Sequence, residues 1–172
     1  MTHKNIEIKA SSKNHAEIRE ILKSKNAEFK GVDNQIDTYF NTKSGRLKLR
    51  EGNIENHLIQ YNRENKSGPK QSDIILYKPA PGSNLKEILM KSMGILVVVA
   101  KKREIYFIDN VKFHLDSVGG LGTFVEIEAI DSTGYTAKEH LFEQCTYYCK
   151  LFKIKSEDLI AESYCDLLLA KN

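Results

Sequence analysis

The stretch Phe124-Val-Glu-Ile-Glu-Ala129 decides the fold, and a similar alternation stands near the start of the chain as Ile6-Glu-Ile-Lys-Ala10. Successive side chains of a β-strand point to opposite faces, so each stretch predicts a strand with one apolar and one charged face. Glu126 and Glu128 share the charged face of the first of these strands. Two acids that face the same way in an apolar strand need a counter-charge nearby.

The same alternation recurs in three further stretches. It appears in Leu47-Lys-Leu-Arg50, in Val97-Val-Val-Ala-Lys-Lys-Arg103 and in Val111-Lys-Phe-His-Leu-Asp116. Two architectures fit this pattern: a sheet with one solvated face, and a closed barrel whose charged faces line its interior. In the barrel, the apolar faces would pack outward against helices. Charges inside a barrel are costly unless they are paired or meet a charged ligand.

Composition predicts one globular domain that spans residues 1–172, because 41% of the 172 residues are hydrophobic. The 26 basic and 23 acidic residues give a net charge of +3, which argues against non-specific binding to nucleic acid. Cys145, Cys149 and Cys165 are too few for a disulfide framework. The first two favour a place in a helix core over a metal site. The chain shows no signal-peptide pattern, and its longest apolar run, 95–100, is too short to span a membrane, so a cytoplasmic protein is expected.

Hydrophobic periodicity and turn signals predict about eight strands and four helices, in an order dominated by hairpins. After a first strand at the N-terminus, strands are expected over 36–40, 47–50, 57–64, 73–78, 95–102, 104–109, 111–116 and 123–130. Helices are expected over 14–27, 83–94, 136–152 and 156–170. The predicted architecture is α+β with an antiparallel sheet, and eight strands can close into a barrel whose interior is wide enough for one small ligand.

The charged faces combine two kinds of side chain that together suit a metal-bound polyphosphate. Lysine and arginine match phosphate oxygens, whereas carboxylates on adjacent strands suit Mg²⁺ or Mn²⁺. The basic candidates are Lys9, Lys48, Arg50, Arg63, Lys101, Arg103 and Lys112. The acidic candidates are Glu7, Glu126 and Glu128, followed by Asp37 and Asp116.

Simpler interpretations remain open for several of these residues. A solvated strand end would explain the basic run 101–103, and Arg63 stands beside the polar loop 65–72, which is compatible with surface exposure. His114 fits a hydrogen-bonded wall residue better than a catalytic base. Glutamates 126 and 128 therefore have the strongest functional case.

The order and spacing of these strands resemble the CYTH domain, whose fold is called the triphosphate tunnel, and within it the class IV adenylate cyclase branch. The resemblance covers nearly the whole chain and implies an α+β fold: a closed eight-stranded antiparallel β-barrel, or tunnel, with helices packed on its outside. It rests on Ile6-Glu-Ile-Lys9, Ile36-Asp-Thr-Tyr-Phe40, Arg46-Leu-Lys-Leu-Arg50, Leu58-Ile-Gln-Tyr61 with Arg63, Val99-Ala-Lys-Lys-Arg103, Phe113-His-Leu-Asp116, Leu121-Gly-Thr-Phe-Val-Glu-Ile-Glu128 and Ser163-Tyr-Cys-Asp-Leu167.

The resemblance implies a role for each charged candidate. Glu7, Glu126 and Glu128 would hold Mg²⁺ or Mn²⁺ and form the catalytic set together with Lys9, and the seven basic residues named above would bind the triphosphate. Two positions depart from the family pattern. Asn5 stands where the family signature Glu-x-Glu-x-Lys has its first glutamate, and a lysine stands at position 112, where arginine is common.

The resemblance implies an enzyme that acts on ATP, in which the ribose 3′-hydroxyl attacks the α-phosphorus and pyrophosphate leaves. A triphosphatase that hydrolyses inorganic, thiamine or nucleoside triphosphate is the alternative. A non-catalytic module that binds polyphosphate or a nucleotide is the second alternative. The expected partner is ATP or another triphosphate, with no nucleic acid and no membrane, and a homodimer is left open.

Overall fold

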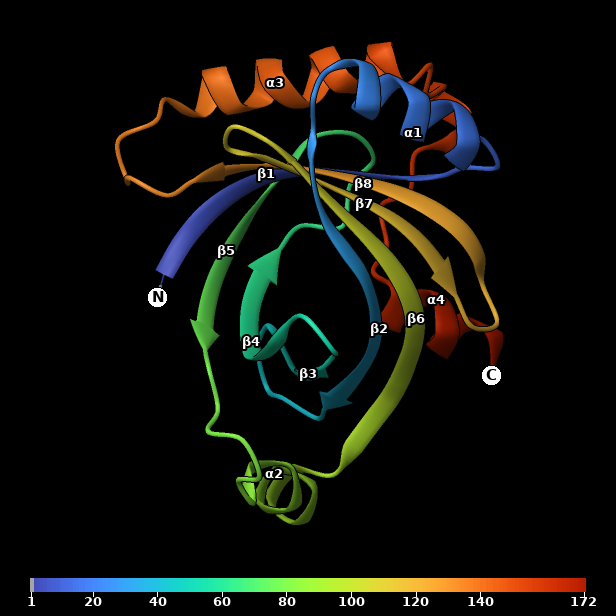
Figure 1. Ribbon diagram of the computed structural model, residues 1–172. Coiled ribbons are helices and arrows are strands. Elements are labelled where there is room, and N and C mark those ends of the chain that lie inside the picture. The colour runs from blue at the N-terminus through green and yellow to red at the C-terminus, as the bar shows by residue number, and fades with distance from the viewer. Residues whose placement is uncertain (1) are drawn as a thin grey trace.

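The computed structural model describes residues 2–172, which form a β-barrel with helices outside it (Figure 1). The strands are Thr2–Ser11 (β1), Glu28–Phe40 (β2), Arg46–Glu51 (β3), Asn56–Arg63 (β4), Lys70–Tyr77 (β5), Ile95–Ile108 (β6), Val111–Val118 (β7) and Gly122–Asp131 (β8). The helices are His15–Ser24 (α1), Leu85–Met93 (α2), Lys138–Leu151 (α3) and Tyr164–Lys171 (α4). The strands are antiparallel and close in the order β1-β5-β4-β3-β2-β6-β7-β8. The α+β tunnel expected from the sequence is therefore confirmed.

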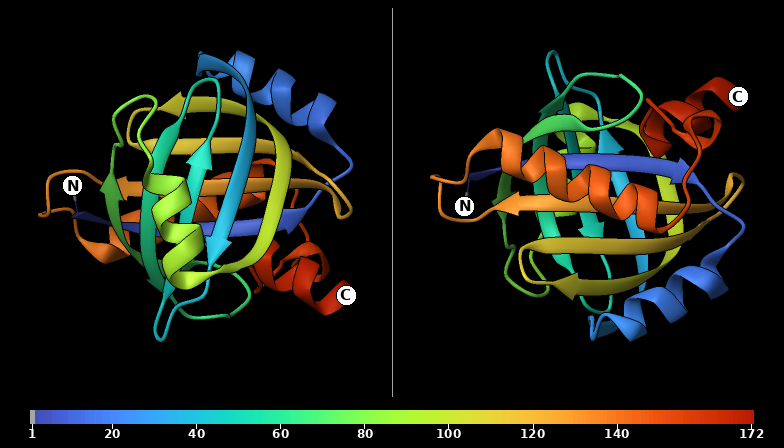
Figure 2. Two further views of the ribbon diagram at one scale, coloured as in Figure 1. Left: turned by 90° about the horizontal axis from the view of Figure 1, so that it is seen from below. Right: turned by 90° about the horizontal axis from the view of Figure 1, so that it is seen from above.

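The main hydrophobic core lies outside the barrel, between the outer faces of β1, β7 and β8 and the helices α1 and α3. Figure 2 shows α3 lying across β1 and β8. Ile8, Phe113 and Ile127 are buried in this core, each from a different strand. Cys145 of α3 is fully buried there, and its thiol donates to the carbonyl of Ile6 at 3.1 Å, which confirms its predicted place in a helix core.

The strands β2 and β6 are longer than the sequence predicts. The expected strands 95–102 and 104–109 are wrong as separate elements, because they form the single strand β6, and β2 begins at Glu28 and not at Ile36. The two pair along nearly their whole lengths, from Phe40 opposite Ile95 to Glu28 opposite Phe107. A register shift at Gly31, whose φ is +123°, interrupts this long ribbon as it curves around the barrel.

The start predicted for the C-terminal helix, expected over 156–170, is also wrong. Residues Ser156–Asp158 form only one 3₁₀ turn, and α4 begins at Tyr164. The chain between them runs along the end of β1, where the amide of Ile160 donates to the carbonyl of Lys9 at 2.9 Å. Ser163 then starts α4 with a capping box. Tyr164 is thereby delivered to one end of the barrel.

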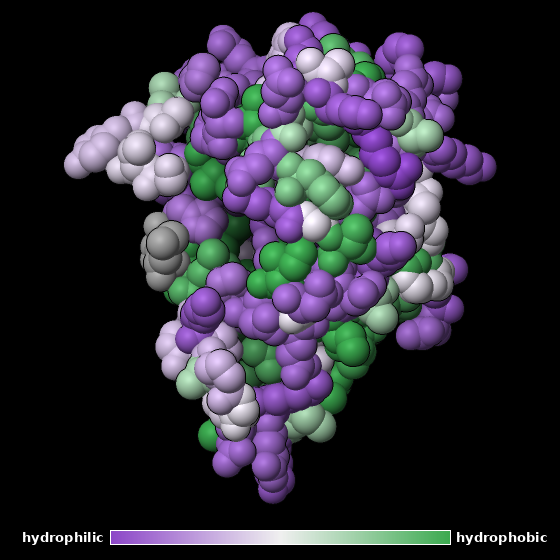
Figure 3. Space-filling view, viewed as in Figure 1, coloured by the Kyte–Doolittle hydropathy of each residue, from purple (hydrophilic) through white to green (hydrophobic). Residues whose placement is uncertain are grey.

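The outer surface is mixed in character. Hydrophilic residues predominate on the face shown in Figure 3, with hydrophobic residues interspersed among them. Several exposed hydrophobic side chains lie on the strands themselves, such as Ile36, Ile75 and Val98. Within residues 2–172, every helix is too short or too polar to cross a lipid bilayer.

Candidate functional site

A cavity of about 330 Å³ lies inside the barrel. Ten of the twelve charged candidates from the sequence line it: Glu7, Lys9, Lys48, Arg50, Arg63, Lys101, Arg103, Lys112, Glu126 and Glu128. The other two, Asp37 and Asp116, are buried and bind cations of this lining. Lys101 and Arg103 are buried, whereas Lys102 between them is exposed, so a solvated strand end is the wrong interpretation of this run. The side chain of Arg63 also points inward and is only 5% exposed. Strand alternation thus places every predicted candidate on the inner face.

Asp37 on β2 gathers three of the cations into one cluster. Its carboxylate is 1% exposed and accepts from Arg50 twice at 2.9 Å, from Lys48 at 2.9 Å and from Lys101 at 2.7 Å. Burial by itself would raise the pKa of Asp37, but Arg50, Lys101 and Lys48 outweigh it and hold the pKa well below its usual value. Burial lowers the pKa of Lys48 to about 8, against the opposing attraction of Asp37. Burial likewise lowers the pKa of Lys101, against the attraction of Asp37. The cluster therefore holds three basic side chains around one carboxylate in the cavity wall.

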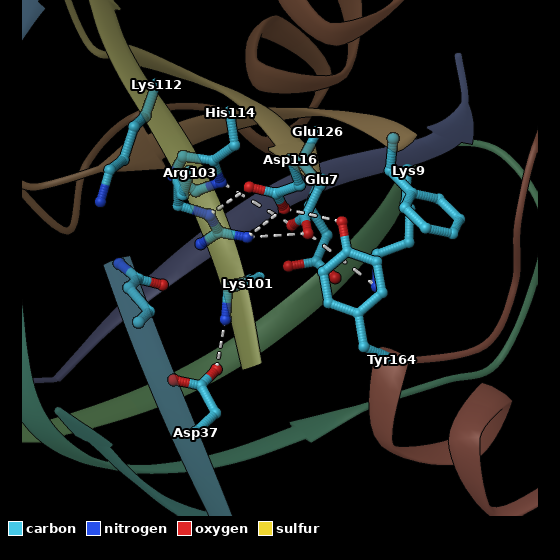
Figure 4. Close-up of polar contacts among 12 residues, drawn as sticks. Glu7, Lys9, Asp37, Lys101, Arg103, Lys112, His114, Asp116, Glu126 and Tyr164 are labelled. Atoms are coloured by element: carbon cyan, nitrogen blue, oxygen red, sulfur yellow. Dashed lines mark hydrogen bonds and ion pairs between the residues drawn. The ribbon is translucent and has the colours of Figure 1, made fainter. Parts of the chain in front are cut away.

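Arg103 on β6 is the centre of a second cluster (Figure 4). Its guanidinium donates to both oxygens of Asp116, at 2.7 and 2.6 Å, and to Glu126 at 3.1 Å. The hydroxyl of Tyr164 donates to Asp116 at 2.7 Å. Lys9 lies 4.0 Å from Glu126, and its ammonium stands 3.9 Å from the centre of the Tyr164 ring. These contacts connect the barrel wall to the C-terminal helix.

Three carboxylates come from adjacent strands. Glu7 on β1 lies directly opposite Glu128 on β8, and the predicted third member, Glu126, is two residues away on β8. Glu7 is paired with Arg63, but the carboxylate of Glu128 forms neither a hydrogen bond nor an ion pair with side chains of residues 2–172. The pKa of Glu128 is raised by burial and by the neighbouring acids Glu7 and Glu126, in spite of Lys112. This position is therefore short of positive charge.

The donor set at these carboxylates suits a divalent cation that prefers oxygen ligands. Asn5 supports this fit, because its side-chain Oδ1 is buried beside them on β1 and lacks a hydrogen-bond partner among the described residues. No three acidic, histidine or cysteine side chains of residues 2–172 converge closely enough to form a ready-made metal site. A cation held here would thus need further oxygens from a ligand, which is how Mg²⁺ is usually bound with phosphates.

His114 on β7 is a buried member of the same wall. Its Nδ1 lies 3.8 Å from Glu126, too far for a hydrogen bond, and both ring nitrogens lack such a partner within residues 2–172. The sequence predicted a hydrogen-bonded wall residue at this position, and the predicted hydrogen bond is wrong. Burial, together with Arg103, lowers the pKa of His114 to about 4, so the ring is neutral at pH 7.

The two ends of the cavity differ. At the end where β1 finishes, the lining includes Ser163 and Tyr164, which are buried. At the opposite end, where β4 begins and β6 finishes, it includes the partly exposed His57 and Phe107. One wall, formed by β4 and β5, is largely apolar and carries Ile59, Tyr61 and Ile74. The cavity is therefore a charged channel with one apolar wall and one more accessible end.

Sequence reasoning missed two residues that contact the predicted set. Glu55 stands in the turn before β4 and binds Arg50 and Lys112. Because turn residues are usually solvated, nothing in the local sequence indicated that its side chain enters the cavity. Tyr164 was placed inside a longer helix. The motif Ser163-x-x-Asp166 is a capping signal that could have marked the true start of α4.

Several solved structures have a fold similar to that of this chain. A conserved hypothetical protein from Pyrococcus furiosus matches with a TM-score of 0.79 at 24% identity, over 95% of this chain and 99% of that chain. A Vibrio parahaemolyticus protein provisionally named an adenylate cyclase matches with a TM-score of 0.72 at 19% identity, over 96% and 97%. A chain of the Schizosaccharomyces pombe Mediator head module matches with a TM-score of 0.60 at 9% identity, over 89% and 95%.

These similarities are below 25% identity and show the fold alone. No curated protein is significantly similar in sequence. The match to a sequence family is more informative, since it covers residues 3–164, from the first strand to the start of α4. This match confirms the family expected from the motifs: the chain belongs to the CYTH domain family.

Proposed function

We propose that this CYTH protein is a metal-dependent enzyme that acts on a triphosphate, and that its reaction is the cyclisation of ATP to cyclic AMP and pyrophosphate. One observation carries the proposal. A cluster of cations around Asp37 and a group of carboxylates around Glu128 line the same cavity. Phosphoryl chemistry needs both, because catalysis consists mostly of positioning and of neutralising charge.

The chain's own residues would position the phosphates. Lys48, Arg50 and Lys101 are held in place by Asp37, so little reorganisation is needed when phosphate oxygens arrive. Arg103 is likewise fixed by its two bonds to Asp116. A divalent cation, held by Glu7, Glu126 and Glu128, would supply additional positive charge at the triphosphate. In this arrangement the carboxylates bind the cation and the basic residues bind the phosphates.

The more accessible end of the cavity supports a nucleoside triphosphate. His57 and Phe107 line that end and are partly exposed, whereas Tyr164 is buried at the other end. A substrate longer than its triphosphate would extend toward the accessible end, where aromatic rings can pack against a base. This end therefore favours ATP over inorganic triphosphate.

A second candidate, a non-catalytic binding module, is favoured by one observation. Glu7 and Glu126 are engaged by Arg63 and Arg103, and no ready-made metal site exists among residues 2–172. A module of this kind would bind polyphosphate through its cations without turnover.

Product analysis separates the candidates. The protein is incubated with ATP, and separately with tripolyphosphate, in the presence of Mg²⁺ or Mn²⁺. Cyclic AMP with pyrophosphate is the expected result from ATP. ADP with orthophosphate from ATP, and no cyclic AMP, would refute the cyclase and indicate a triphosphatase, which would also release pyrophosphate and orthophosphate from tripolyphosphate. Metal-dependent binding with no turnover of either compound would indicate the binding module.

Glu128→Gln tests the role of the carboxylates, since Glu128 makes no ion pair within the described chain that the substitution could break. We expect this variant to lose metal-dependent activity while its thermal stability stays at or above that of the wild type, because it relieves repulsion from Glu7 and Glu126. Glu20→Gln on the exposed face of α1 is the matched control. Full activity of Glu128→Gln would show that this acid does not hold the metal.

A further inference from the structure

The turn between β3 and β4 places one carboxylate on two of the proposed phosphate-binding residues. Glu55 accepts from Nη1 of Arg50 at 3.0 Å and forms an ion pair with the ammonium of Lys112. Gln35 also donates to it, at 3.2 Å. The side chain of Glu55 is 16% exposed and lines the cavity at its more accessible end. Two cations that suit phosphate are thus bridged by an acid of this chain.

The turn is built to hold this position. Asp33, which is fully buried, accepts from the amides of Ile54 and Glu55, both at 2.9 Å, and from Gln35 at 2.7 Å. Gly52 leaves room for that carboxylate, because a Cβ at this place would lie 2.5 Å from an oxygen of Asp33. The backbone of the turn is therefore fixed, and the Glu55 carboxylate stands at the partly exposed edge of the cavity, where Arg50, Lys112 and Gln35 bind it.

Two other acids that bind cations here, Asp37 and Asp116, are buried more deeply than Glu55. Asp37 is 1% exposed and receives donors from three residues, and Asp116 is fully buried between Arg103 and Tyr164. A phosphate oxygen could not replace either one without stranding a charge inside the wall. Glu55, by contrast, can turn toward solvent when another anion takes its place.

We propose that Glu55 is a competing carboxylate that sets the affinity of the tunnel for polyphosphate. A phosphate oxygen replaces it on Arg50 and Lys112 when the ligand enters, and Glu55 competes for the same donors when the ligand leaves. Carboxylate and phosphate oxygens bind these cations with the same geometry, so the two anions exclude each other. This inference rests on the proposed binding of triphosphate.

The test compares the dissociation constants of tripolyphosphate and pyrophosphate, measured by calorimetry in excess Mg²⁺. We expect Glu55→Gln to bind both about tenfold more tightly than the wild type, because a neutral amide competes weakly for charged donors. Glu55→Asp, which keeps the charge but reaches less far, should show a smaller gain. Glu51→Gln is the matched control, since Glu51 pairs with Lys86 outside the cavity, and it should change affinity less than about twofold.

The outcomes are separable. If both Glu55 variants bind the phosphates as tightly as the wild type, or less tightly, the inference is overturned and the proposed function stays intact. Glu55 would then hold the two cations in place. If neither the wild type nor the variants bind tripolyphosphate or pyrophosphate, both the inference and the proposed function are overturned. A lower melting temperature of Glu55→Gln together with tighter binding supports competition, because a merely structural role would weaken both properties.

Discussion

Replacing Asp37 by asparagine should strongly destabilise the barrel. The substitution keeps the shape of the side chain but removes the charge that faces Lys48, Arg50 and Lys101. All three cations have side chains no more than 13% exposed, so water cannot readily replace the lost carboxylate. We expect the free energy of unfolding to fall.

The magnitude follows from the contacts. Asp37 accepts four hydrogen bonds from charged donors, at 2.7 to 2.9 Å, and each such bond contributes roughly 1.5–3 kcal/mol. These contributions are not additive, because the three cations repel one another and an amide oxygen still accepts one or two bonds. Removal of one member of a buried ion pair costs about 3–5 kcal/mol, so a loss of about 4 kcal/mol is expected at pH 7.

Urea unfolding followed by circular dichroism measures this loss, with Asp73→Asn on the exposed face of β5 as the matched control. The pH dependence provides a second check. The pKa of Asp37 in the fold lies well below its unfolded value, so its stabilisation is fully present above about pH 5 and is lost as pH falls through the folded pKa. The wild-type and Asp37→Asn stabilities should therefore converge in acid. Equal stabilities at pH 7 would refute the reasoning.

Three further results are expected. The wild-type affinity for tripolyphosphate, measured by calorimetry, should fall between pH 7 and 9, because Lys48 has a pKa of about 8 and loses its charge in this range. Lys48→Arg should not show this fall, and parallel pH profiles of the two proteins would contradict the prediction. Tyr164→Phe should lower the unfolding free energy by about 1 kcal/mol in urea, through loss of the bond to Asp116, and an unchanged value would count against it. Gly52→Ala should destabilise by about 1–3 kcal/mol, because its Cβ would crowd Asp33; a neutral effect in thermal unfolding would show that the turn can shift.

The balance of charges in the cavity has a functional consequence. Nearly every cation there already has a carboxylate partner, as with Arg63 on Glu7 and Lys112 on Glu55. Under the proposed function, a triphosphate would therefore exchange pairs such as these two for new ones and would not enter an uncompensated positive field. Such exchange would keep affinity moderate and so permit release of the pyrophosphate that the proposed cyclase reaction forms.

The inner face of the barrel could be predicted because strand alternation is a local property. The positions of Lys101 and Arg103 follow from the side-chain period of two, whatever the partner strand is. The pairing of Glu7 with Glu128, and of Lys9 with Glu126, could not be predicted in the same way. It depends on the register between strands that are more than a hundred residues apart in the sequence.

The sequence by itself determined which residues share one face of each strand, the α+β class and the family, because these depend on local periodicity and on short motifs. Only the tertiary structure decided which charges meet. It brought Glu55 from a turn onto Arg50 and Lys112, and it ended β1 against the segment that carries Tyr164. The physical reason is that ion pairing is set by distances across the closed barrel, which the closure and stagger of its strands fix.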